Sequence, residues 1–316
     1  MMPRTSIARS LCLLALMAAL LPTLAMAAAP TPSEPYTGPI IDSHAHLRLG
    51  EGDAMGPGHR IGTDALRALD FEAGIGRSAL IVMAASGDMA ATRAKNDAAI
   101  AAAREHPGHF YPVASVHPFD GDAALAEIDR LAGLGVRQVK LHPNSQEFDV
   151  ADPRVAAVVA RCGERRLAVL MDSYNPMDPG QLGKLLALAM ANPGTNFVFA
   201  HMGFSQFRET HAFALLRKLG LPRNVWFDLS ATLVYFQDSP MQDELLWTMR
   251  RIGMDRMLFG SDWPVDAPGT ALAAARALPL TADEQRLFFH DNAVALLRLD
   301  PVAPVDLHAT DEVGEP

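Results

Sequence analysis

The sequence contains the stretch PIIDSHAHL at residues 39–47, in which a short apolar run is followed directly by Asp42, His44 and His46. Successive side chains of a β-strand point to opposite faces, so two histidines separated by one residue lie on the same side. Such a pair can share one metal ion, because imidazole is the commonest metal ligand in proteins. The chain has 11 histidines, so this pair alone could equally be two strand-end side chains that are hydrogen-bonded to the backbone.

The same order, an apolar run and then polar residues, repeats along the chain. Runs rich in β-branched and aromatic residues predict eight strands, at residues 39–41, 79–84, 111–116, 136–141, 167–171, 196–200, 224–229 and 256–259. Stretches with helical spacing lie between them, at residues 64–72, 92–105, 123–134, 154–166, 181–191, 207–219 and 241–252. Eight β/α alternations predict an α/β domain that is a single (β/α)8 TIM barrel over residues 39–300. An open, doubly wound sheet is the competing architecture, but the first β/α turn lacks the GxGxxG signature of that fold.

Polar residues directly follow several of the predicted strands after the first. Taken strand by strand, they are Lys140 within the last residues of the fourth strand and His142 directly after it, Asp172 after the fifth, His201 after the sixth and Asp262 after the eighth. The C-terminal ends of barrel strands meet on one face, so these side chains should lie close to His44 and His46. A catalytic divalent ion needs about three nitrogen or oxygen ligands and an open position for water. The joint placement therefore favours a metal site over chance.

Composition and charge limit the classes of partner. Hydrophobic residues make up 49% of the 316 residues and charged residues 20%, which is typical of a globular chain. The formal net charge is −9, and phosphate binding needs clustered positive charge. We therefore expect a small-molecule substrate and no nucleic acid as a partner, and the sequence carries no signal of oligomeric state.

The two ends of the chain differ in composition from the predicted barrel. Residues 1–27 have a basic start, an apolar run too short to span a bilayer and an Ala-Met-Ala end, which together predict a cleaved signal peptide. We expect an exported protein, periplasmic or secreted, with no membrane insertion after cleavage. Residues 28–38 are predicted to be a flexible linker and residues 301–316 an acidic tail. Cys162 would be the one cysteine of the mature chain, so no internal disulfide is expected.

The motifs, taken together, resemble those of a known family. They are HAH at residues 44–46, KLHP at 140–143, AHMG at 200–203, GSDWP at 260–264 and FFHDNAVALLRL at 288–299. Their order and positions resemble the amidohydrolase superfamily, specifically its amidohydrolase-related group of metal-dependent barrel hydrolases. The resemblance implies a (β/α)8 fold with one or two divalent ions, usually zinc. Its members hydrolyse amides, esters and lactones, or decarboxylate small aromatic and unsaturated acids.

Carried over by position, the resemblance makes His44, His46 and Asp262 metal ligands, and makes His201 a ligand or the group that polarises the substrate. The chain departs from the family pattern at the fifth strand, where Asp172 stands in place of a histidine. Asp172 could ligate through oxygen, or the site could work without metal, as a few members of the family are thought to do. We expect one zinc ion, with Asp172 or Asp262 completing the ligand set.

The predicted mechanism follows from the placement of charge. A metal-activated water would attack a carbonyl, with Asp262 moving its proton to the leaving group and His201 stabilising the oxyanion. Asp262 could instead cap the helix that follows it. Lys140 could pair with Asp172 or Asp262, or after carboxylation bridge two metals.

Loop residues on the same face are candidates for substrate contact, because these loops carry specificity in barrel enzymes. They are His117 after the third strand, Tyr174 after the fifth and Trp263 after the eighth, with His142 as a further metal or pocket residue. Asp228, on the seventh strand, is expected to be a hydrogen-bonded barrel residue.

Three hypotheses about function remain open from the sequence. The first is hydrolysis of an amide, ester or lactone, which export for scavenging favours. The second is non-oxidative decarboxylation of a small unsaturated or aromatic acid by the same ion. The third is a barrel that binds a ligand without catalysis, which Asp172 leaves open.

Overall fold

The computed structural model describes residue 34 and residues 36–48, 62–221, 223–302 and 304–305. The chain divides into two units, Met1–Pro32 and Ser33–Pro316, and every described residue lies in the second. The predicted signal peptide at residues 1–27 lies outside the described residues, as do most of the predicted linker and tail.

Eight parallel strands form one sheet in sequence order. They are β1 (Ile41–Asp42), β2 (Arg77–Ile81), β3 (Phe110–Ser115), β4 (Gln138–Leu141), β5 (Ala168–Asp172), β6 (Phe197–Ala200), β7 (Val225–Asp228) and β8 (Met257–Leu258). Each strand pairs with the next one along the chain, as in Asp172 beside Ala200 across β5 and β6. This order is that of the predicted (β/α)8 TIM barrel.

The first and last strands close the barrel. The amide of Ser43 donates to the carbonyl of Phe259 at 2.9 Å, and the amide of His46 donates to the carbonyl of Trp263 at 2.8 Å. Ala45 and Trp263 also form a parallel bridge. The segments that follow β1 and β8 are therefore neighbours, which places His44 and His46 beside Asp262.

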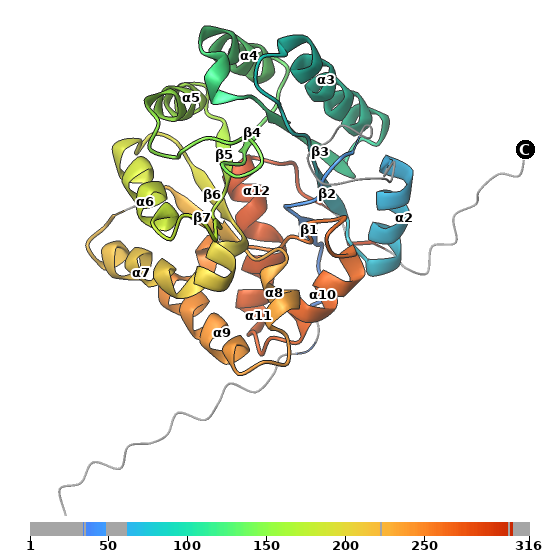
Figure 1. Ribbon diagram of the computed structural model, residues 1–316. Coiled ribbons are helices and arrows are strands. Elements are labelled where there is room, and N and C mark those ends of the chain that lie inside the picture. The colour runs from blue at the N-terminus through green and yellow to red at the C-terminus, as the bar shows by residue number, and fades with distance from the viewer. Residues whose placement is uncertain (1–33, 35, 49–61, 222, 303, 306–316) are drawn as a thin grey trace, which may run out of the picture. The chain divides into compact units, whose positions relative to one another are not determined.

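Helices surround the strands (Figure 1). The α-helices are α2 (Thr63–Ala73), α3 (Met89–Glu105), α4 (Asp122–Gly133), α5 (Pro153–Glu164), α6 (Gln181–Ala191), α7 (His211–Lys218), α8 (Thr232–Phe236), α9 (Met241–Ile252), α10 (Pro268–Arg276), α11 (Ala282–Arg286) and α12 (Asn292–Leu297). Segments with 3-10 or π geometry are η1 (Pro118–Asp120), η2 (His201–Thr210), η3 (Met254–Arg256) and η4 (Leu287–Asp291). In the described part of the chain no helix has the length and apolar character needed to cross a membrane.

The core has an outer and an inner layer. The largest cluster packs the outward side chains of the strands, such as Val139 and Phe199, against the helices. Inside the barrel, Ile81, Leu170 and other strand residues pack together with Leu296 and Leu297 of α12. Figure 1 shows α12 behind the strands, where it covers one end of the barrel. The opposite end, at which the strand C-termini lie, is the mouth of the barrel.

Several predicted boundaries are displaced. The first strand was expected at residues 39–41 and the second at 79–84, but the ladders are Ile41–Asp42 and Arg77–Ile81. An apolar run indicates which residues are buried, not which of them pair with a neighbouring strand. Ile40, for example, is buried although it lies outside β1. The helix expected at 207–219 is α7 alone, because the 3-10 segment η2 occupies His201–Thr210. The helix α8 and the helices after β8 are additions that the spacing did not predict.

Part of the predicted linker packs on the barrel. Tyr36 is half-buried, and its ring stacks on Phe289 with the ring centroids 5.6 Å apart. Val302, in the predicted tail, packs against the inner cluster. The packed structure therefore extends slightly beyond residues 39–300 at both ends.

Candidate active site

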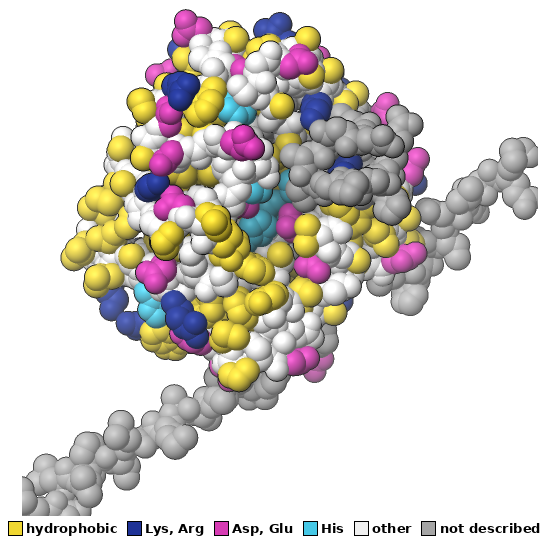
Figure 2. All heavy atoms as spheres, viewed as in Figure 1, with side chains coloured by type: hydrophobic (Ala, Val, Ile, Leu, Met, Phe, Trp, Pro, Cys, Tyr) yellow, Lys and Arg dark blue, Asp and Glu magenta, His cyan; other side chains and the backbone are white. Residues whose placement is uncertain are grey.

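A cluster of histidines and carboxylates lies at the mouth of the barrel. His44 Nε2 lies 3.2 Å from His46 Nε2, and each of these nitrogens lies 3.3 Å from Asp262 Oδ1. All three side chains are almost fully buried. Figure 2 shows histidine atoms beside acidic ones in a hollow on this face. The pairing that β-strand geometry predicts for His44 and His46 is present.

His201 and Asp172 form the other half of the cluster. His201 Nε2 lies 3.3 Å from Asp172 Oδ2 and 3.9 Å from Asp262 Oδ2. His142 Nε2 lies 3.5 Å from the same Asp172 oxygen. Asp172 therefore faces His142 and His201, whereas Asp262 faces His44 and His46.

Local structure around β1 and β8 brings Asp262 close to His44. The Asp262 amide donates to the His44 carbonyl at 2.6 Å, and Asp262 has a positive φ of 62°. A Cβ on Gly260 would meet His44 Cβ at 2.8 Å, so only glycine fits there. The helix α10 begins at Pro268 with Ala267 as its N-cap, so Asp262 is not the helix cap that was the alternative interpretation.

Hydrogen bonds fix the orientation of two of the imidazoles. His44 Nδ1 lies 3.1 Å from Asp228 Oδ2, and a carboxylate can only accept, so we assign the proton to Nδ1 and the lone pair to Nε2. His201 Nδ1 lies 3.0 Å from the Ser230 carbonyl, which places a proton on Nδ1 of this ring as well. The His44 Nε2 lone pair then faces the centre of the cluster, as in histidines that bind metals.

Asp228 and Ser230 are the functional residues that sequence reasoning understated. Asp228 is a hydrogen-bonded barrel residue, as expected, but its partner is His44. The Ser230 hydroxyl lies 3.1 Å from His44 Nδ1 and 3.0 Å from His201 Nδ1. Asp228 follows an apolar run, as the site residues do, and that was its signal. The sequence gives no comparable signal for Ser230.

Burial and neighbouring charges shift the pKa values of the cluster in opposite directions. Burial lowers the pKa of His46 to about 4 and that of His142 to about 4, despite nearby carboxylates. Burial would also lower the pKa of His201, but Asp262 and Asp172 outweigh it and raise that pKa to about 9. Burial opposes ionisation of Asp262, yet the histidines around it hold its pKa well below the usual range. At neutral pH the cluster contains charged carboxylates and a cationic His201.

Lys140 lies in the cluster, fully buried on β4. Its Nζ lies 3.3 Å from His44 Nε2, so its close partner is an imidazole and not Asp172 or Asp262. Among the described residues, Lys140 Nζ has no carboxylate oxygen of Asp172 or Asp262 within 4 Å, so the expected ion pair is not formed. The reason is that both carboxylates face histidines.

The three residues expected to contact substrate have different surroundings. Both ring nitrogens of His117 are bonded to the backbone, with Nε2 at 2.7 Å from the Gln146 carbonyl and Nδ1 accepting from Phe119. Trp263 packs in a hydrophobic cluster at the β1–β8 seam. Tyr174 is half-buried, and its amide donates to Asp172 Oδ1 at 3.1 Å. Tyr174 and Trp263 are each bonded to the cluster through their backbone, Tyr174 to Asp172 and Trp263 to His46.

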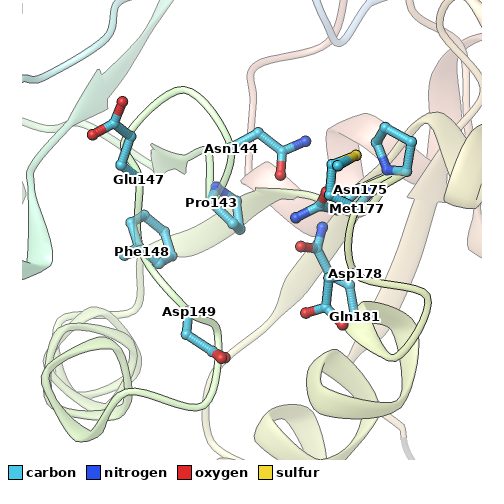
Figure 3. A pocket seen from close by; sticks show the side chains of 10 residues that line it. Pro143, Asn144, Glu147, Phe148, Asp149, Asn175, Met177, Asp178 and Gln181 are labelled. Atoms are coloured by element: carbon cyan, nitrogen blue, oxygen red, sulfur yellow. Dashed lines mark hydrogen bonds between the residues drawn. The ribbon is translucent and has the colours of Figure 1, made fainter.

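A pocket of about 530 Å³ lies between the loops that follow β4 and β5. Asn144 and Phe148 line one side, and Asn175 and Met177 the other (Figure 3). Lys184 bridges Asp149 and Asp178 at 2.8 Å each and so joins the two loops. These loops begin directly after His142 and Asp172, which places the pocket on the same face as the cluster.

The geometry of the cluster fits a divalent cation. His44, His201 and Asp262 each offer one ligand atom, and these atoms lie within 4.8 Å of one another. Ligands about 2.1 Å from a tetrahedral metal are about 3.4 Å apart, close to the 3.2–3.3 Å separations among His44, His46 and Asp262. A possible metal site therefore lies where the strand ends meet.

The family is established by comparison with known proteins. The model of the amidohydrolase family matches residues 41–299. The chain therefore belongs to the amidohydrolase family, as its motifs predicted. A comparison with curated proteins finds no match.

Solved structures share the fold at low identity. A 2,6-dihydroxybenzoate decarboxylase from Rhizobium is 18% identical with a TM-score of 0.65, over 83% of this chain and 99% of that one. A candidate 2-pyrone-4,6-dicarboxylic acid hydrolase from Pseudomonas putida is 22% identical with a TM-score of 0.62, over 83% and 98%. A 5-carboxyvanillate decarboxylase from Novosphingobium aromaticivorans, with bound manganese, is 15% identical with a TM-score of 0.61, over 83% and 97%. At these identities the likeness establishes the (β/α)8 fold.

Proposed function

We propose that the protein is a metal-dependent hydrolase that acts on an amide, ester or lactone carbonyl of a small molecule. One observation carries the proposal: Asp262 Oδ1 lies 3.3 Å from both His44 Nε2 and His46 Nε2, while Asp262 Oδ2 faces His201 at 3.9 Å. The Asp262 carboxylate therefore contacts both the histidine pair that would bind the cation and His201, which can carry a proton.

The donor set suits a single zinc ion. A catalytic zinc keeps an open position, so three protein ligands suffice, and His44, His46 and Asp262 would hold it. Once bound, the cation would acidify a water molecule and polarise a carbonyl oxygen. His201 completes the set of donors that can reach a metal, but its closest carboxylate is Asp172, which favours a role in proton transfer.

The chain's own residues supply the remaining chemistry. The Asp262 carboxylate, ionised at neutral pH, accepts the proton of the attacking water and passes it to the leaving group. His201, whose pKa is raised to about 9, donates a hydrogen bond to the oxyanion that develops on the carbonyl. The Ser230 carbonyl holds His201 Nδ1, so Nε2 is kept pointing into the site.

Decarboxylation is the second candidate, and the structural likeness to two decarboxylases favours it. In that reaction the cation would hold the substrate carboxylate, and His201 would protonate the carbon that loses CO2. A barrel that binds a ligand without catalysis is the third candidate, and the low pKa of Asp262 beside paired histidines argues against it, because such an arrangement is typical of active sites.

Metal content is the first test. Elemental mass spectrometry of purified protein should find about one zinc per chain. His44→Ala should lose it, whereas Asp172→Ala should retain it, because Asp172 faces His142 and His201. Asp70→Ala is a matched control, since Asp70 is equally buried beside His109 outside the cluster. Absence of metal after reconstitution at neutral pH would refute the proposed mechanism.

Isotope labelling separates the three candidates. In H2 18O, hydrolysis of 4-nitrophenyl acetate or δ-valerolactone should place 18O in the product carboxylate. In D2O, decarboxylation of 2,6-dihydroxybenzoate would release CO2 and leave deuterium on the ring. A loaded protein that catalyses neither reaction across panels of such compounds, yet binds one of them, would support the binding barrel.

We also propose that the protein is exported. The basic start, apolar run and Ala-Met-Ala end of residues 1–27 support this. Expression of the full chain, followed by cell fractionation and N-terminal sequencing, should yield a periplasmic or secreted protein beginning at Ala28. A full-length N-terminus on cytoplasmic protein would contradict the proposal.

A further inference from the structure

Three aromatic side chains form a continuous row on the face that carries the cluster. Tyr174 and Phe204 have ring centroids 5.1 Å apart, and Phe204 and Tyr235 have centroids 4.8 Å apart. The residues come from successive segments, after β5, within η2 and within α8. We call Tyr174, Phe204 and Tyr235 the aromatic row.

The aromatic row is tied to the catalytic cluster at each of its three segments. The Tyr174 amide donates to Asp172 Oδ1 at 3.1 Å. Phe204 follows His201 by three residues in η2. The Thr232 hydroxyl in α8 donates to the His201 carbonyl at 2.6 Å. The row therefore runs beside His201 and Asp172, along the β5 to β7 side of the mouth.

The aromatic row packs on a buried phenylalanine on one side and is exposed to solvent at Tyr235. Phe236 contacts both Phe204 and Tyr235, and it is 3% exposed, whereas Tyr235 is 63% exposed. Exposed aromatic surface is unfavourable in water. Phe204 also has a φ of 49° and a ψ of −119°, a conformation that costs free energy in any residue but glycine. The fold thus holds an aromatic surface open beside the cluster against two opposing costs.

We propose that the aromatic row binds a planar aromatic part of the substrate, next to the carbonyl that the cluster attacks; this inference rests on the proposed function. Aromatic rings stack in offset or edge-to-face arrangements with centroids about 4.5–7 Å apart, and the row already has this spacing. A protein partner would need about 800 Å² of surface, more than three partly covered rings of about 150–250 Å² each supply. The row is a specificity surface for a small molecule.

A binding experiment tests the row without catalysis. Saturation-transfer NMR compares benzyl alcohol with cyclohexylmethanol, which has the same number of carbon atoms but is not planar. We expect the wild type to bind benzyl alcohol more tightly, and Tyr235→Leu to weaken that binding about fivefold. Tyr235→Phe should retain it, because the ring is kept. Trp247→Ala is the control, since Trp247 is 51% exposed on α9 outside the row.

A kinetic experiment links the row to the reaction. The ratio of kcat/KM for benzyl acetate over cyclohexylmethyl acetate should fall about fivefold in Tyr235→Leu and not in Tyr235→Phe. If neither ester is hydrolysed but benzyl alcohol binding still depends on Tyr235, the aromatic row stands, and hydrolysis of these esters is excluded separately. Equal binding of the two alcohols by the wild type, or an equal loss in Trp247→Ala, would overturn the inference.

Discussion

The bond from His44 Nδ1 to Asp228 Oδ2, 3.1 Å long, sets the direction of the His44 lone pair. We predict that Asp228→Asn lowers the affinity for zinc about 10–100-fold, because a carboxylate that orients a ligating histidine also makes it more basic. Titration against a competing chelator measures this. Asp70→Asn is the control: Asp70 is buried and bonded to His109 and Ser78, neither of which belongs to the cluster. Equal zinc affinities of Asp228→Asn and Asp70→Asn would show that Asp228 does not support metal binding through His44.

The sequence predicts which residues meet but not which atoms pair. His44, His46, His201 and Asp262 converge as expected, because each follows a strand and the ends of barrel strands share one face. The partners of Asp172, Lys140 and Ser230 depend on side-chain rotamers, which no spacing encodes. Asp172, a possible ligand by its position in the sequence, faces His142 and His201 in the structure.

One glutamine joins three loops at the mouth of the barrel. Gln146 Nε2 donates to the carbonyls of Ala84 and Val116, each at 3.0 Å, and its Oε1 accepts from the His142 amide at 2.8 Å. We predict that Gln146→Leu lowers the free energy of unfolding by about 2–4 kcal/mol, because buried backbone groups lose their partners. Urea denaturation measures this.

The control for that glutamine is Gln242→Leu, because Gln242 is half-buried and its Oε1 accepts one amide, that of Asp238. It should lose less than about 1 kcal/mol. A Gln146→Leu protein as stable as this control would show that the loops after β2, β3 and β4 hold their positions without the side chain.

A buried carboxylate couples α3 to α4 and predicts a pH dependence. Burial opposes ionisation of Glu127, but hydrogen bonds from Arg130 and Asn96 outweigh it and lower the pKa of Glu127. A folded pKa below the unfolded one adds stability above the unfolded pKa, and this is lost as the pH falls through the folded value. From about pH 5 downward, the wild type should therefore lose stability more steeply than Glu127→Gln. Denaturation midpoints across that range measure the slopes, and parallel slopes would refute this.

The elements between strands were predicted unevenly, and the cause is local. The bounds of α6 and α9 match the spacing, because both are amphipathic and continuous. The 3-10 segment η2 continues to Thr210, so the α-helix that the sequence expects from residue 207 begins only at His211. Apolar periodicity reports the buried face of an element, whereas its ends depend on backbone angles that site geometry imposes.

The architecture of the whole barrel follows from its sequence, because eight alternations leave few topologies. What the sequence does not contain is the closure of β1 on β8, which rests on pairings between residues more than 200 positions apart, such as Ser43 with Phe259. The proposed cation would sit at this seam, since His44 and His46 follow β1 and Asp262 follows β8. Metal binding and closure of the barrel are therefore expected to be coupled.

Removal of metal should lower the melting temperature of the wild type. A ligand that binds only the folded state stabilises it by about 4 kcal/mol at 1,000 times its dissociation constant, which corresponds to roughly 5–10 °C for a domain of this size. Differential scanning calorimetry before and after chelator dialysis measures the shift, and added zinc should restore it. His44→Ala should melt at one temperature in both states, because its site is broken. If the melting temperature of the wild type does not respond to zinc, metal binding at the cluster does not stabilise the closure of β1 on β8, and the predicted coupling is wrong.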